Sequence, residues 1–174
     1  NFVQGQNLLS LHGLYYSTPG GWWEWAPPCN HFRMPYWEDM DKLLACTERL
    51  SYLLSQGYHR ADIALLYPVE PVIAGNGKGA VNCAFETGRA LYADGIDFDF
   101  MDYQSLARAE IKGNELHVSG ERFKVLIIPA MQTIQSKSLQ KAIEFKKAGG
   151  LVICIDIRPD ATETSRNDVN IQTL

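Results

Sequence analysis

The chain has 174 residues, of which 46% are hydrophobic and 21% are charged, a composition typical of a soluble globular protein. Its formal net charge of −4 and the lack of any stripe of Lys and Arg argue against nucleic acid as a partner. No apolar run approaches the roughly 18 residues that a membrane span requires, so we expect no membrane association. The chain begins inside a strand-like pattern without an initiator Met, and we therefore expect a piece of a longer protein.

The N-terminal part of the chain is unusually aromatic. A short apolar strand over residues 7–13 is followed by a stretch, ending at Trp37, that holds all four tryptophans. Gly and Pro interrupt this stretch repeatedly, which is incompatible with a regular helix or a central strand. The stretch must therefore form a loop. A loop this aromatic either packs against other protein or holds a ligand.

An amphipathic helix is predicted over residues 37–56. Its apolar residues recur at helical spacing, and Gly57 is a suitable stop just past the last turn. These apolar residues are Trp37, Met40, Leu43, Leu44, Leu50, Leu53 and Leu54.

From about residue 61 the pattern changes to apolar strands that alternate with helices. Near-continuous apolar strands indicate a parallel sheet covered on both faces. Right-handed crossovers then give a doubly wound, flavodoxin- or Rossmann-like α/β fold. Strands are predicted over residues 61–67, 96–101, 123–128 and 151–156, helices over 80–93, 104–109 and 136–147, and a hairpin with a Gly-Asn turn over 111–118.

A Gly-rich loop precedes the helix at residues 80–93. The residues from Gly75 to Ala80 fit the pattern G-x-G-x-x-A, and Asp97 follows about 20 residues later, as in dinucleotide-binding folds. However, that fingerprint requires the first Gly immediately after a strand, and here Pro68 and Pro71 intervene. A phosphate-binding loop of the Walker type fails because Gly79 replaces the required Ser or Thr. A flexible crossover is favoured, with a free-standing nucleotide- or flavin-binding module as the alternative.

Cysteine chemistry is not indicated by the spacing. Cys29, Cys46, Cys83 and Cys154 form no CxxC pair, which argues against a zinc site and favours buried free thiols. A glutamine-amidotransferase-like hydrolase shares the predicted sheet but needs a Cys on a sharp strand-to-helix turn. The residues after Pro129 are Ala, Met and Gln, so no nucleophile stands there.

The aromatic stretch carries the side chains that bind sugars. Aromatic rings cover the apolar C–H surface of a sugar, while carboxylates, amides and imidazoles reach its hydroxyls. A polar residue that ends a strand and precedes such a loop is typical of the rim of a barrel enzyme. For any single residue, packing against neighbouring protein is the commoner role. The candidate substrate-binding residues are His12, Tyr15, Trp22, Trp23 and Glu24.

Several segments, in this order, resemble glycoside hydrolase family 106, the α-L-rhamnosidases, and related large bacterial glycosidases. The second half is also similar to the trimerisation domain of family 42 β-galactosidases. The N-terminal segments are GQNLLSLHG at 5–13, PGGW at 19–22, PYW at 35–37 and DIALLYP at 62–68. The C-terminal segments are FDFMD at 98–102, FKVLIIP at 123–129 and GGLVI at 149–153.

The resemblance implies a parent enzyme with a (β/α)₈ catalytic barrel. Its acid and base carboxylates would lie on earlier barrel strands, so this chain alone should hydrolyse nothing and contributes no catalytic residue. His12 would end the last barrel strand and face the sugar, with Tyr15 close by. The spacing of Glu24 and Glu38 gives no support for an acid–base pair.

The same resemblance sets the expected domains. Residues 1–36 would be the last strand and rim loop of the barrel, residues 37–160 an α/β accessory domain, and residues 161–174 a linker or truncated tail. The accessory domain would support the barrel or form a homo-oligomer. Carbohydrate is the partner through the parent barrel, no cofactor or metal is implied, and a periplasmic or secreted location is favoured. A purely structural interaction domain is a third interpretation, which predicts an exposed apolar patch.

Overall fold

The computed structural model describes residues 1–14, 30–166 and 169–174. The chain divides into two compact units, Asn1–His59 and Arg60–Leu174. The sequence placed a domain boundary after residue 36, before the long helix, whereas the contacts group this helix with the segment that precedes it.

The first unit is dominated by one helix. A short 3₁₀ helix, η1 (Phe2–Gln4), lies near its start, and a second, η3 (Trp37–Asp39), leads into α1 (Met40–Leu54). The predicted helix is therefore confirmed, with its first turn in the tighter 3₁₀ form. Met40 is buried, but most of the leucines of α1 are exposed, including Leu43 at 51%. Gly57, in the left-handed region at φ 78°, follows the end of the helix.

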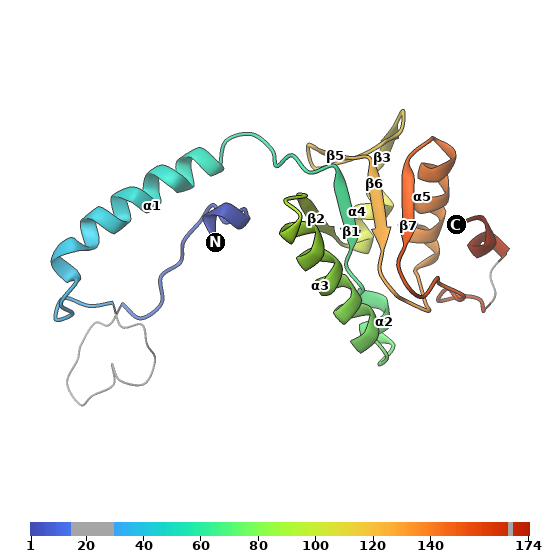
Figure 1. Ribbon diagram of the computed structural model, residues 1–174, viewed down its shortest axis with the longest axis horizontal. Helices are drawn as coiled ribbons and strands as arrows, with labels where there is room; N and C mark the ends of the chain where they lie inside the picture. Colours follow the sequence, from blue (N-terminus) through green and yellow to red (C-terminus); the bar gives the residue numbers. More distant parts are fainter. Residues whose placement is uncertain (15–29, 167–168) are drawn as a thin grey trace. The chain divides into compact units, whose positions relative to one another are not determined.

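The second unit is built on a four-stranded parallel sheet (Figure 1). Its strands are β1 (Ile63–Leu66), β2 (Phe98–Met101), β6 (Val125–Ile128) and β7 (Leu151–Cys154). They lie in the order β2-β1-β6-β7, and every neighbouring pair is parallel. All four were predicted as strands, three from their apolar runs and β2 from its alternation of apolar and polar residues, and the predicted α/β fold is confirmed.

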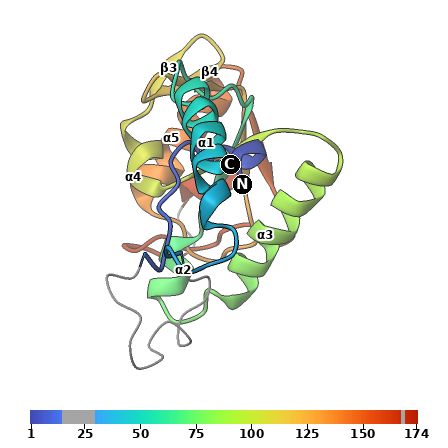
Figure 2. The ribbon, with the colours of Figure 1, turned by 90° about the vertical axis from the view of Figure 1, so that its left-hand side faces the viewer.

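Helices lie on both faces of this sheet. In Figure 2, α3 (Lys78–Ala93) lies on one side, and α4 (Tyr103–Arg108) and α5 (Ser136–Lys147) lie on the other. The connection from β1 to β2 also contains α2 (Val69–Ile73). Asp102 caps α4, because its carboxylate accepts hydrogen bonds from the backbone N–H groups of Gln104 and Ser105 at 2.8 and 2.9 Å.

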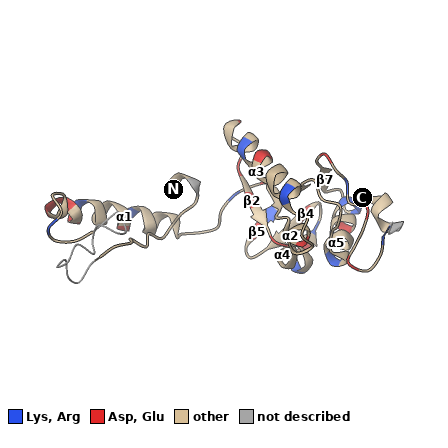
Figure 3. Ribbon diagram, turned by 90° about the horizontal axis from the view of Figure 1, so that it is seen from below, with Lys and Arg blue, Asp and Glu red and all other residues tan. Residues whose placement is uncertain are grey.

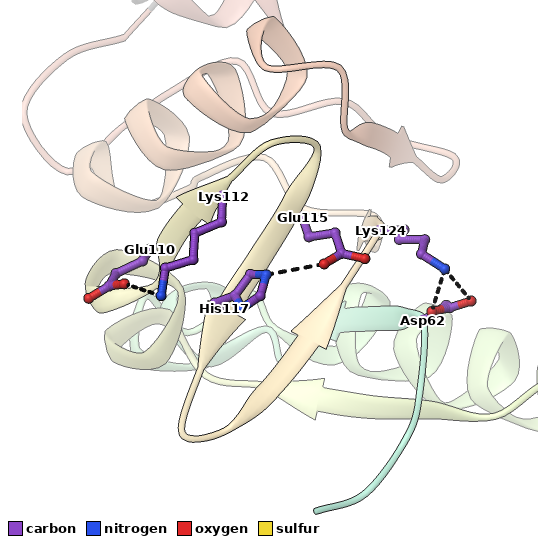
Figure 4. Close-up of polar contacts among 6 residues, drawn as sticks. All are labelled: Asp62, Glu110, Lys112, Glu115, His117 and Lys124. Atoms are coloured by element: carbon purple, nitrogen blue, oxygen red, sulfur yellow. Dashed lines mark hydrogen bonds and ion pairs between the residues drawn. The ribbon is translucent and has the colours of Figure 1, made fainter.

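A small antiparallel sheet is inserted between α4 and β6. It consists of β3 (Glu110–Lys112), β4 (Glu115–Val118) and β5 (Glu121–Phe123), so the predicted hairpin is confirmed and extended by a third strand. The turn between β3 and β4 consists of Gly113, at φ 61°, and Asn114. Polar side-chain contacts lie on and beside the small sheet (Figure 4), and the exposed ion pairs among them contribute little individually. The contacts are Glu110–Lys112, Glu115–His117 and Asp62–Lys124.

The core lies between the sheet and the layer of α4, α5 and the small sheet. It contains one face of each parallel strand, together with the inner residues of α5 such as Phe145. The C-terminal segment, expected to be a linker or truncated tail, packs onto this core through Ile171 and Leu174. Lys146 secures it by donating a hydrogen bond to the carbonyl of Leu174 at 2.8 Å.

The opposite face of the sheet is covered unevenly. There α3 packs over β1 and β2, with the ring of Phe98 close against Gly88. Ile127 of β6 is 5% exposed, but its neighbours on β7, Leu151 and Ile153, are 54% and 38% exposed. Apolar surface is therefore left open on β7.

Candidate functional site

The predicted sugar-binding residues lie in the first unit. Tyr15, Trp22, Trp23 and Glu24 fall in residues 15–29, outside the described residues. His12 is described, and its imidazole belongs to an exposed residue. Its backbone carbonyl accepts a hydrogen bond from the Nδ2 of Asn30 at 2.7 Å.

Asn30 joins the two flanks of the aromatic stretch. Its backbone N–H donates to the carbonyl of Gly13 at 2.8 Å, and it forms a parallel bridge with Leu14. Asn30 is buried, as is the adjacent His31, whose Nδ1 accepts a hydrogen bond from the backbone N–H of Arg33 at 3.0 Å. Residues 12–14, before the predicted rim loop, and residues 30–31, after it, are thus joined into a single anchor at the base of the loop. Sequence patterns did not predict this role of Asn30.

The second unit has a pocket at the carboxyl edge of its parallel sheet. It has a volume of about 280 Å³ and lies between the start of α3 and the segments that follow β6 and β7. Strands β1 and β6 are neighbours, and the helices that follow them, α3 and α5, lie on opposite faces of the sheet. This is the topological switch point, where doubly wound sheets hold ligands. The pocket, called here the switch-point pocket, includes Asn76, Gly79, Ala80, Gln132, Thr133 and Asp156 in its lining.

Backbone contacts fix the segments around the switch-point pocket. The N–H of Ala130 points to the Sγ of Cys83 at 3.3 Å, which joins the end of β6 to α3. The N–H of Asp160 donates to the carbonyl of Gln132 at 2.9 Å, which joins the segments after β6 and β7. Asp156 has a left-handed backbone at φ 62°, a conformation that Asp tolerates better than most residues. The sequence did not identify any of these residues as a site.

The Gly-rich loop does not have the geometry of a dinucleotide-binding turn. Helix α2 stands between β1 and Gly75, and α3 begins only at Lys78. The first Gly therefore cannot place the helix N-terminus directly at the end of β1, as that fingerprint requires. The predicted crossover loop over residues 71–79 is shorter than expected, because α2 extends to Ile73.

Glu70 has a buried carboxylate, and sequence patterns did not single it out. Both of its oxygens are shielded from solvent and have no hydrogen-bond partner among the described residues. Burial raises the pKa of Glu70, its own backbone N–H lowers the pKa by less, and the nearby charge of Glu163 raises it by a smaller amount again. The ionised form of Glu70 therefore destabilises the fold.

Replacing Glu70 with Gln should stabilise the chain at pH 7 by about 1 kcal/mol, a value kept small because the side chain is only partly buried. A raised folded-state pKa means that the penalty is absent below the usual value of 4.5 and grows as the pH rises above it. The gain should therefore vanish near pH 4, as measured by urea unfolding at both pH values. Glu86→Gln, at an exposed site on α3, is the matched control. A gain that is equal at both pH values would contradict this assignment.

The described residues offer little sign of a metal or thiol centre. No cluster of three or more His, Cys, Asp or Glu among them is arranged to hold a metal ion. Cys83 and Cys154 are partly buried, and burial raises the pKa of the Cys154 thiol. Cys46 is exposed, so the prediction that it is buried was wrong. Figure 3 shows Lys and Arg interspersed with Asp and Glu on the helices of the second unit. Within the described ranges, no helix is long and apolar enough to cross a membrane.

Comparison with known proteins bears on the fold. Neither a protein-family model nor a curated protein matches the chain. Among solved structures, the rhamnosidase from Novosphingobium sp. PP1Y is similar with a TM-score of 0.51 and 19% identity, over 73% of this chain and 12% of that one. The β-galactosidase from Bifidobacterium adolescentis is similar with a TM-score of 0.48 and 17% identity, over 66% of this chain and 53% of that one. The chain thus spans about an eighth of the length of the rhamnosidase and about half of the length of the β-galactosidase. Its fold is one that occurs in a glycoside hydrolase.

Proposed function

We propose that this chain is a section of a glycoside hydrolase. In this proposal, residues 1–36 supply the last strand and rim loop of a catalytic barrel, and the second unit is a non-catalytic accessory domain. The observation that carries the proposal is the fold of the second unit. A fold similar over 73% of this chain occurs within a much longer rhamnosidase, and the motifs of this sequence follow the order expected for such enzymes.

A non-catalytic role agrees with the carboxyl edge of the sheet. The segment after β6 presents Ala130, Met131 and Gln132, which supply no nucleophile. The nearest thiol, Cys83, lies inside α3 and receives the backbone N–H of Ala130. A thiol engaged in this way, with no sharp strand-to-helix turn to expose it, is unsuited to nucleophilic attack.

The rim loop is proposed to contact the sugar. His12, Tyr15, Trp22, Trp23 and Glu24 would line the substrate side of the loop, whose flanks are joined by the anchor at Asn30. Cleavage itself would take place between two carboxylates on earlier strands of the parent barrel. This chain would then contribute substrate binding and support, without a catalytic group of its own.

An oligomer formed through the second unit is a further part of the proposal. It would bury Leu151 and Ile153, which β7 leaves exposed. The partner would be a second copy of the parent protein, as the resemblance to the family 42 trimerisation domain implies.

The proposal is tested by comparing two proteins, this chain and a form extended by the coding sequence upstream of Asn1. Both would be assayed with 4-nitrophenyl α-L-rhamnoside and 4-nitrophenyl β-D-galactoside. The extended protein should hydrolyse at least one glycoside, and residues 1–174 alone should hydrolyse neither. Hydrolysis by the isolated chain, or an upstream sequence without alternating strands and helices, would contradict the proposal.

A further inference from the structure

The switch-point pocket has features of a ligand site that belongs to the second unit alone. We infer that it binds a small, neutral, polyhydroxylated molecule of about the size of one sugar ring. Its position is the first argument, because a crevice outside the carboxyl ends of parallel strands, at the topological switch point, is where doubly wound folds bind ligands.

The size of the pocket restricts the ligand. Its volume of about 280 Å³ lies just below the range of about 300–1,000 Å³ that is usual for small-molecule sites. A dinucleotide or a flavin needs a longer cleft, and α2 occupies the path between β1 and the Gly-rich loop. A single six-membered ring with its substituents fits this volume.

The polar groups of the pocket suit hydroxyls. Asn76, Gln132, Thr133 and Asp156 come from three separate segments, and no hydrogen bond or ion pair joins these side chains to other described residues. Two amides and one hydroxyl can both donate and accept, and the carboxylate accepts. A ligand hydroxyl also donates and accepts, so a polyol can pair with all four.

The charges around the pocket favour a neutral ligand. Gly79 and Ala80 lie in the first turn of α3, a 16-residue helix whose N-terminus carries a partial positive charge. Asp156 places a negative charge on the same cavity. An anion would be repelled by Asp156 and a cation by the helix N-terminus. Ile157, which is 46% exposed, adds apolar surface suited to C–H groups to the lining.

This inference is independent of the proposed glycosidase activity. The pocket is formed entirely by residues of the Arg60–Leu174 unit, so binding should not require a barrel. Failure of one proposal therefore leaves the other standing.

The test is an amide NMR titration of the 174-residue chain with D-glucose, D-galactose and L-rhamnose, and with inorganic phosphate as the rival probe. We expect at least one sugar to shift the amides of Gly79, Ala80 and Gln132, with a dissociation constant of about 1–10 mM given so few ligand atoms. Asp156→Asn should weaken binding about tenfold, because it removes a charge-assisted hydrogen bond while Asn still tolerates the left-handed backbone.

The matched control is Asp94→Asn, which makes the same change of charge at the end of α3 and should leave binding unchanged. The spectra themselves show whether each variant is folded. Two results would overturn the inference: no sugar shifts these amides, or phosphate shifts them while the sugars do not. The second result would mean that the helix N-terminus binds anions.

Discussion

Replacing Phe145 with alanine should lower the free energy of unfolding of the second unit by about 3–5 kcal/mol. The side chain is fully buried in α5 and belongs to the core between the sheet and its outer helices. The following turn faces the ring with Gly150, at which a Cβ would lie 2.1 Å from the ring. Because glycine has no side chain, this turn cannot fill the cavity that the substitution leaves. Since small domains are stable by only about 5–15 kcal/mol, a large share of the stability would be lost.

The measurement must report on the second unit. All four tryptophans lie between Trp22 and Trp37, in the first unit, so tryptophan fluorescence would follow the wrong part of the chain. Urea unfolding followed by far-ultraviolet circular dichroism is suitable, because four of the described α-helices and both described sheets lie in the second unit. Phe85→Ala removes the same ring from a site that is 43% exposed and should have less than a third of the effect. Equal losses in the two variants would place Phe145 outside the core.

Replacing Trp22 and Trp23 together with alanine in the extended protein should lower kcat/KM by about 10- to 100-fold. The reason is the proposed contact of their rings with the C–H faces of the sugar. Loss of binding made equally in the ground state and the transition state raises KM and leaves kcat nearly unchanged. The effect would therefore appear mainly in KM.

The control for the tryptophan variant is Tyr92→Ala, an exposed aromatic residue on α3 in the second unit. It should leave both kinetic constants unchanged. If the tryptophan variant behaves in the same way, the aromatic stretch packs against protein and the sugar contact is wrong. A fall in kcat with unchanged KM would instead indicate a role confined to the transition state.

The sequence predicted the parallel sheet well, because its signal is local. Segments such as Leu126–Ile128 are apolar without interruption, and only a strand buried on both faces requires that pattern. It missed α2 because Pro71 reads as a helix breaker. Pro is tolerated in the first turn of a helix, and α2 places it there, two residues after Val69.

Features that depend on distant contacts could not be predicted. Ile171 and Leu174 are too few to mark the tail as part of a core, and their burial depends on α5 and Lys146. The switch-point pocket gathers residues from three separate segments, of which only the Gly-rich loop stood out in the sequence, and the left-handed backbone of Asp156 leaves no trace there. The predicted rim residues have a conspicuous sequence pattern, but most of them lie outside the described residues, so their role stays a prediction.

The central place of β1 bears on how the chain folds during synthesis. Ile63 pairs with Phe98 on one side and with Val125 on the other, so β1 lacks at least one of its two strand neighbours until the segment that contains Val125 has been made. Long loops must close before these pairings stabilise anything, which slows folding. Leu65 and Leu66, both fully buried in the finished unit, would meanwhile be exposed on the nascent chain. A ribosome-bound chain that ends before Val125 should therefore bind chaperones well, whereas the chaperone should dissociate once the complete unit has been made.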